Sequence, residues 1–130
     1  MKVIVCLDDN NGMLFNNRRQ SRDSLLIEHI MSGSGDEKLN ILEFSKGLFT
    51  QYAGKINVVT EIKCEGVYFI ENVDLTEFVD MIDEITVYKW NRAYPADFCC
   101  NIDFSSFVVK DVCEFTGNSH EKITKIVYGR

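Results

Sequence analysis

The chain has 130 residues, a formal net charge of −6 and 45% hydrophobic residues, a composition typical of a folded domain rather than a disordered segment. A chain of this length buries roughly two-thirds of its unfolded surface, so residues 1–130 are expected to form one domain. The acidic balance disfavours a nucleic-acid partner, because phosphates are bound by a basic face. No stretch approaches the roughly 20 apolar residues that cross a bilayer, and the short N-terminal apolar run is not a secretory signal, so we expect a cytoplasmic protein with no membrane partner.

The first half of the chain alternates between strand-like and helix-like patterns. The β-branched run KVIVCL predicts a buried strand, which ends at a turn over residues 8–12. Apolar residues at helical spacing from Ser21 onward predict a helix, with Ser21 or Asp23 as its N-cap. Beyond it, LNILEF predicts a second strand, KGLFTQYA a short helix that Ser45 caps and Gly54 ends, and KINVVT a third strand.

The second half of the chain is richer in strands. The sequence predicts a fourth strand at VYFIENV, a short helix at DLTEFVDMI capped by Asp74, a fifth strand at EITVYKW, and two final strands at FVVKDVCEF and KITKIVYGR. This order predicts an α/β fold of three layers, with a mainly parallel sheet flanked by helices and antiparallel strands at the C-terminus. Such a sheet binds its ligand outside the carboxyl ends of its strands, and residues 8–19 directly follow the first strand.

Three arginines precede or begin the first predicted helix. Because guanidinium groups match carboxylates and phosphates, Arg18, Arg19 and Arg22 are candidates for binding a ligand, together with the amide of Gln20. The alternative is a solvated turn in which the arginines offset nearby aspartates. The sequence leaves both interpretations open.

Asp23 is the candidate catalytic acid of this segment. Burial would raise its pKa and the adjacent arginines would lower it, and we expect the lowering to prevail, which disfavours proton donation at neutral pH. As a helix N-cap, Asp23 needs no further role.

Other reactive side chains carry weaker signals. Ser119, His120 and Glu121 invite comparison with hydrolytic groupings, but sequence neighbours rarely have catalytic geometry, and a turn is the expected structure. Trp90 is expected to pack at the sheet edge. The five cysteines include no CxxC pair, which indicates free thiols in a reducing compartment, and the two separated histidines suggest no metal site.

Several of these segments resemble dihydrofolate reductase. VIVCLDDNNGML is similar to that family's opening strand and glycine-bearing loop, DEITVYKWNRAYPADFCCNIDF to its late strand and acidic loop, and NSHEKITKIVYGR to its closing strand. The resemblance implies a dihydrofolate-reductase-like sheet. It also places Asp23 near the family's acidic residue, which binds the pteridine ring, and Tyr88 where a threonine supports that acid.

The chain departs from this family where NADPH would bind. The strand that ends in two adjacent glycines in the family ends here in Glu71 and Asn72, whose charge and bulk would oppose a dinucleotide. The cofactor loop is replaced by residues 44–47, and six residues between Thr60 and Val67 replace a strand and helix. The resemblance therefore implies no cofactor, with NADPH disfavoured.

The sequence favours a divergent dihydrofolate-reductase-like protein that binds a small anionic or heterocyclic molecule near the first strand–helix loop, without conventional folate reduction. One alternative is a non-enzymatic interaction domain, including a homodimer. A further alternative is an NADPH-dependent reductase that retains its activity. If the protein is an enzyme, an oxidoreductase of the dihydrofolate reductase type is expected.

Overall fold

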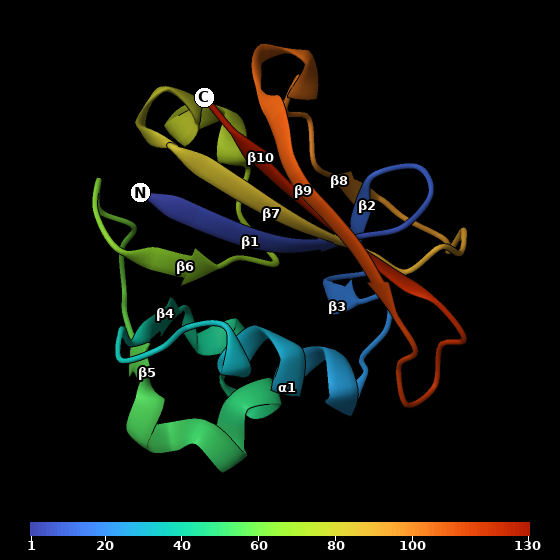
Figure 1. Cartoon of the computed structure of the whole chain (residues 1–130), viewed down its shortest axis with the longest axis horizontal. Helices are drawn as coiled ribbons and strands as arrows, with labels where there is room; N and C mark the ends of the chain where they lie inside the picture. Colours follow the sequence, from blue (N-terminus) through green and yellow to red (C-terminus); the bar gives the residue numbers. More distant parts are fainter.

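The computed structural model describes residues 1–130 and is built around a seven-stranded sheet in the order β5-β4-β6-β1-β7-β10-β9 (Figure 1). The strands are β1 (Lys2–Leu7), β4 (Leu39–Ile41), β5 (Ile56–Val58), β6 (Val67–Phe69), β7 (Glu84–Lys89), β9 (Val108–Phe115) and β10 (Ile123–Gly129). Strands β5, β4, β6, β1 and β7 pair in parallel, whereas β10 pairs antiparallel with both β7 and β9. The predicted mainly parallel sheet with antiparallel C-terminal strands is confirmed.

Two helices cover one face of the sheet. These are α1 (Ser24–Ser32) and the 3-10 segment η1 (Glu43–Lys55). Leu26, Ile27, Ile30 and Met31 recur at helical spacing on α1 and pack with Phe49 of η1 against the sheet. Of the two predicted caps, Ser21 and Asp23, the structure has Asp23, whose side chain accepts hydrogen bonds from the N–H groups of Leu25 and Leu26.

The opposite face is covered by shorter pieces. They are the 3-10 segments η2 (Leu75–Met81) and η3 (Phe104–Ser106) and a second sheet of β3 (Arg18–Arg19), β2 (Gly12–Phe15) and β8 (Phe98–Cys99). Their apolar side chains, including Met13, Leu75 and Ile102, pack with Val5 of β1 and Val87 of β7. The predicted three layers are therefore present.

Two local expectations were wrong or incomplete. Ser45 does not cap the second helix, because η1 begins after Leu42 without a side-chain cap and Ser45 instead bonds to Glu71. The second sheet was not predicted, since strands of two to four residues are too short to show an apolar period. Asp74 does cap η2 as predicted.

The structure also shows where Trp90 lies, the state of the cysteines and the character of the helices. Trp90 is 4% exposed and packs in the core at the end of β7, an interior strand of the sheet, rather than at the expected sheet edge. All five cysteines are free. No helix has the length and apolar character needed to cross a membrane.

Candidate functional site

The segment between β1 and α1 is fixed by a buried carboxylate. Asp8 is fully buried and accepts hydrogen bonds from the backbone N–H groups of Asn10, Gly12 and Tyr94 and from Gln20 Nε2. Burial by itself raises the pKa of Asp8, but these hydrogen bonds prevail and lower it. Gly12 is required here, because a Cβ at that position would lie 2.9 Å from Asp8 Oδ1 and 2.6 Å from Gln20 Nε2.

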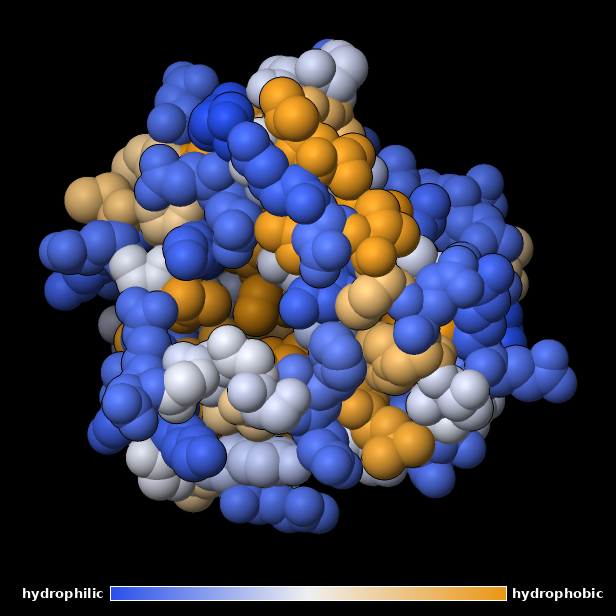
Figure 2. Space-filling model, in the orientation of Figure 1, coloured by the Kyte–Doolittle hydropathy of each residue, from blue (hydrophilic) through white to orange (hydrophobic).

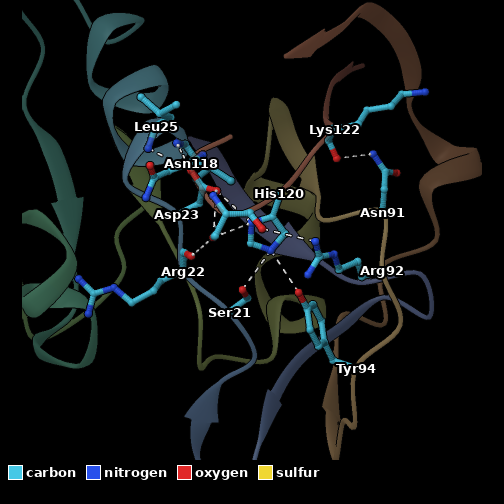
Figure 3. Close-up of polar contacts among 12 residues, drawn as sticks. Ser21, Arg22, Asp23, Leu25, Asn91, Arg92, Tyr94, Asn118, His120 and Lys122 are labelled. Carbon is cyan, nitrogen blue, oxygen red and sulfur yellow. Dashed lines mark hydrogen bonds and ion pairs between the residues drawn. The ribbon is translucent and has the colours of Figure 1, made fainter. Parts of the chain in front are cut away.

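Asp23 joins this segment to the loop between β9 and β10. Its Oδ1 accepts from the N–H of Asn118 at 2.8 Å in addition to the two α1 amides, and its Oδ2 accepts from the N–H of Ser119 at 2.9 Å. His120 Nδ1 lies 2.9 Å from the same Oδ2 (Figure 3). The protein thus occupies both carboxylate oxygens.

The pKa of Asp23 lies well below its ordinary value. Burial would raise it, but the hydrogen bonds from Asn118, Ser119 and His120 to the ionised carboxylate outweigh that effect. The expected direction is correct, whereas the expected cause, adjacent arginines, is not the one found. A carboxylate held ionised in this way is a hydrogen-bond acceptor rather than a proton donor at neutral pH.

His120 has a second set of partners on its other ring nitrogen. Its Nε2 lies 3.1 Å from Ser21 Oγ and 3.1 Å from the Tyr94 hydroxyl, and Figure 3 shows both hydroxyls aimed at the imidazole. The ring is 3% exposed and stacks on Trp90 with 4.5 Å between ring centroids. Residues 116–122 do form a loop, as expected, but the sequence did not identify His120 as a site residue. The Ser119–Glu121 grouping was the only signal for it.

Arg19 is engaged by a buried carboxylate at the end of β6. Its Nε and Nη2 donate to Glu71 Oε2 and Oε1 at 2.9 and 3.0 Å, and Ser45 Oγ donates to Glu71 Oε1 at 2.7 Å. The guanidinium also donates to the Phe44 carbonyl. Nearby, burial and the Glu71 charge raise the pKa of Cys6, so this thiol stays protonated and is a poor nucleophile.

Two cavities adjoin the N-terminus of α1. The first, of about 20 Å³, lies among Cys6, Gln20, Ser21 and Trp90, and the second, of about 110 Å³, runs between α1 and η1. Both are lined by Arg22, Asp23, Ile27 and Leu48. The first holds about one water molecule, so only the second has room for part of an organic ligand.

The three candidate arginines do not converge. Arg22 lines both cavities, and its guanidinium makes no hydrogen bond or ion pair within the protein. Arg18 lines a separate open depression beside Phe15 and Tyr94. Arg19 is held by Glu71 and borders both that depression and the first cavity, but none of these cavities is lined by all three arginines. A clamp of three arginines is absent from this conformation.

Gln20 and Tyr88, the other two candidate ligand-binding residues, lie in different parts of the structure. Gln20 Oε1 is buried beside the first cavity without a protein donor. The Tyr88 hydroxyl bonds to His29 Nδ1 at 3.0 Å and lines a groove of about 230 Å³ that Asp23 does not border. The support for Asp23 that the resemblance implied for Tyr88 comes instead from the β9–β10 loop.

Comparison with known proteins identifies the fold. No family model matches the sequence, and no curated protein matches it. Among solved structures, the chain is similar to a dihydrofolate reductase from Enterococcus faecalis complexed with NADP(H) and RAB-propyl, with a TM-score of 0.67, 12% identity, and coverage of 100% of this chain and 96% of that chain. The fold is therefore dihydrofolate-reductase-like.

Proposed function

We propose that this dihydrofolate-reductase-like protein binds a small anionic molecule in the crevice between α1 and η1, with Arg22 as its anion-binding residue. The observation that carries the proposal is Arg22, an exposed residue that lines both cavities and whose guanidinium has no partner in the protein. An unpaired guanidinium beside a concave surface is suited to a carboxylate or phosphate.

The walls of the crevice indicate the rest of the ligand. Ile27 and Leu48 are apolar, Tyr52 adds an aromatic edge, and the polar groups of Thr50 and Gln51 lie at the same groove. A cavity volume of about 110 Å³ is well below the roughly 300 Å³ at which drug-sized pockets begin. The proposed ligand is therefore a small organic acid of about the size of benzoate, with its ring against the apolar wall.

The candidate residues near the crevice have supporting roles in this proposal. Asp23 holds the N-terminus of α1 in place, because its oxygens already accept five protein hydrogen-bond donors and a sixth from the Ser119 hydroxyl. Gln20 offers its free Oε1 to a donor in the first cavity. Arg18 and Tyr88 lie outside the crevice.

Glu71 argues against NADPH as a partner. At the end of β6, where the family resemblance calls for glycines, its carboxylate is 9% exposed and is bonded to Arg19 and Ser45. A cofactor phosphate would meet this negative charge, and displacing Arg19 would leave the carboxylate buried without its counter-ion. These residues do not fit a dinucleotide.

Thermal-shift titration tests the proposed site. Benzoate, inorganic phosphate, folate and NADPH are titrated separately, and benzoate is expected to raise the melting temperature in proportion to the logarithm of its concentration. Arg22→Ala should abolish this shift. Arg18→Ala removes the same charge from a different depression and should leave it unchanged. Equal loss in both variants would indicate nonspecific charge attraction, and a saturable shift with NADPH would overturn the proposal.

A second candidate function is self-association through β9. This strand is an edge of the seven-stranded sheet, and Val108, Val109 and Val112 are 57, 53 and 54% exposed. Figure 2 shows hydrophobic surface gathered along the position of β9. If two copies paired antiparallel with Val112 at the two-fold axis, Lys110 of each copy would lie opposite Glu114 of the other. Opposite charges would then face each other at two places along the interface.

Sedimentation equilibrium distinguishes this candidate from the ligand-binding one. A concentration-dependent dimer that Val112→Lys converts to a monomer would support β9 pairing. Leu25→Lys, at another exposed apolar residue, is the matched control and should leave the dimer intact. A monomer at all concentrations would exclude this second function without affecting the first.

A further inference from the structure

A serine, a histidine and an aspartate form a continuous hydrogen-bonded chain at the N-terminus of α1. Ser21 Oγ lies 3.1 Å from His120 Nε2, and His120 Nδ1 lies 2.9 Å from Asp23 Oδ2 (Figure 3). In this order, a hydroxyl contacts one nitrogen of the imidazole and a carboxylate contacts the other. That connectivity is the one by which a buried carboxylate orients a histidine base toward a serine nucleophile.

The surroundings give each member the form its role requires. Asp23 is ionised and its side chain is fully buried, so its Oδ2 is suited to accept a hydrogen bond from Nδ1–H of His120. In that tautomer of the neutral imidazole, Nε2 carries the lone pair. The Trp90 ring stacked on the imidazole fixes its plane. Ser21 is half-buried and is one of the residues that line the first cavity, which is large enough only for the reacting carbonyl group. The rest of an ester would lie in the adjoining second cavity, which shares Arg22, Asp23, Ile27 and Leu48 with the first.

We propose that Ser21 is a nucleophile activated by His120 and Asp23, and that the protein cleaves esters of small carboxylic acids. Ser21 Oγ attacks the ester carbonyl carbon and its proton passes to His120 Nε2. The carbon–oxygen bond to the alcohol then breaks, and the departing oxygen takes that proton. Water, deprotonated by His120 Nε2, then attacks the acyl-serine. The bond from the acyl carbon to Ser21 Oγ breaks, Oγ takes the proton back from His120, and the acid is released. No redox partner is needed.

The developing negative charge on the carbonyl oxygen has a candidate donor. The backbone N–H of Arg22, the residue after the nucleophile, donates to no group of the protein. A free N–H at that position is suited to an oxyanion. Gln20 Oε1, which is buried beside the same cavity without a donor, can accept a hydrogen bond from the attacking water.

Tyr94 competes with Ser21 for His120 Nε2, and this contact gives His120 an alternative, purely structural role. Its hydroxyl also lies 3.1 Å from His120 Nε2, and a single lone pair accepts one proton at a time. If Tyr94 donates to Nε2 permanently, the histidine only joins two loops and Ser21 is inert. Tyr94→Phe separates the two roles, because it removes the competing donor and leaves Ser21 as the remaining partner.

The test uses the full chain with p-nitrophenyl acetate and with a fluorophosphonate that labels activated serines. Both probes are uncharged, so the outcome does not depend on anion binding by Arg22. Label is expected on Ser21, located by peptide mass spectrometry. Ser21→Ala removes the nucleophile on which acylation depends and should lower ester hydrolysis by at least about 100-fold. Tyr94→Phe should preserve or increase both signals.

Ser32→Ala is the matched control, because its exposed hydroxyl donates only to the His29 carbonyl. His120→Gln should abolish labelling of Ser21 while circular dichroism reports whether the fold is kept; if this variant unfolds, Ser21→Ala and Tyr94→Phe decide the matter. Absence of labelling, label on Ser119 instead of Ser21, or hydrolysis unchanged in Ser21→Ala would overturn the proposal.

Discussion

His120 Nδ1 and Asp23 Oδ2 lie 2.9 Å apart although 97 positions separate the two residues in the sequence. Both side chains are almost completely buried. Their contact, with the backbone bonds from Asn118 and Ser119, ties the start of α1 to the loop that closes the last hairpin. The Asp23 carboxylate therefore holds the N-terminus of α1 and the β9–β10 loop together.

Asp23→Asn is expected to lower the free energy of unfolding by about 3 kcal/mol. The amide nitrogen would face donors that now point at a carboxylate oxygen, so buried N–H groups would lose their acceptor. Urea unfolding followed by Trp90 fluorescence measures the change. Asp9→Asn, at an exposed position, should change stability by less than about 0.5 kcal/mol. Similar values for both variants would contradict the burial argument.

The pKa of Asp23 also predicts the acid limb of the stability profile. Because the folded pKa lies below the unfolded value of about 3.9, the unfolded chain binds more protons in this range. The stabilisation is complete above the unfolded pKa and is lost as pH falls toward the folded pKa. Asp23→Asn should flatten the decline below about pH 4, with a residual slope from Asp8, whose pKa is also lowered. An unchanged slope would contradict this assignment.

His29 should contribute to pH dependence nearer neutrality. Burial first, and the charge of Lys125 second, lower its pKa below the ordinary value of about 6.5. The folded protein then binds fewer protons than the unfolded chain, so stability is present above about pH 6.5 and declines as pH falls through this range. In thermal melts between pH 5 and 8, His29→Gln should show a smaller decline than the unsubstituted protein. A steeper decline would reverse the predicted sign.

The Arg19–Glu71 pair should behave as a coupled unit. Arg19→Ala leaves a buried carboxylate with only Ser45 as its side-chain donor, and we expect a loss of about 2 kcal/mol. The double variant Arg19→Ala with Glu71→Ala should be more stable than the sum of the single losses predicts, by about 1 kcal/mol. Chemical denaturation of the four proteins gives this coupling energy. Strict additivity would show that the pair makes no net interaction.

Gly117→Ala tests the close approach of the β9–β10 loop to α1. A Cβ at this position would lie 2.5 Å from Asp23 Oδ2 and 2.8 Å from Ile123 Cδ1, and neither neighbour is at the end of an exposed flexible chain. We expect a loss of about 2 kcal/mol, as for other overpacked sites. Gly47→Ala is the control, because a Cβ there meets nothing within 4 Å. Equal stability of the two variants in thermal melts would contradict the packing argument.

The sequence by itself determined the order of the main elements and the layer arrangement. The β-branched run KVIVCL, the helical spacing of Leu26 and Ile30, and the capping carboxylates Asp23 and Asp74 are local signals, because the side chains that set them lie within one turn or one strand of each other.

Only the tertiary structure decided which of these side chains meet. His120 joins Asp23 and Ser21 because the hairpin of β9 and β10 returns its loop to the start of α1, and Glu71 takes Arg19 because β6 lies beside β1. Such contacts cross 52 to 99 positions of sequence and leave no period in it. Local periodicity follows from the geometry of one element, whereas a site depends on how separate elements pack, and the same local patterns are compatible with many packings.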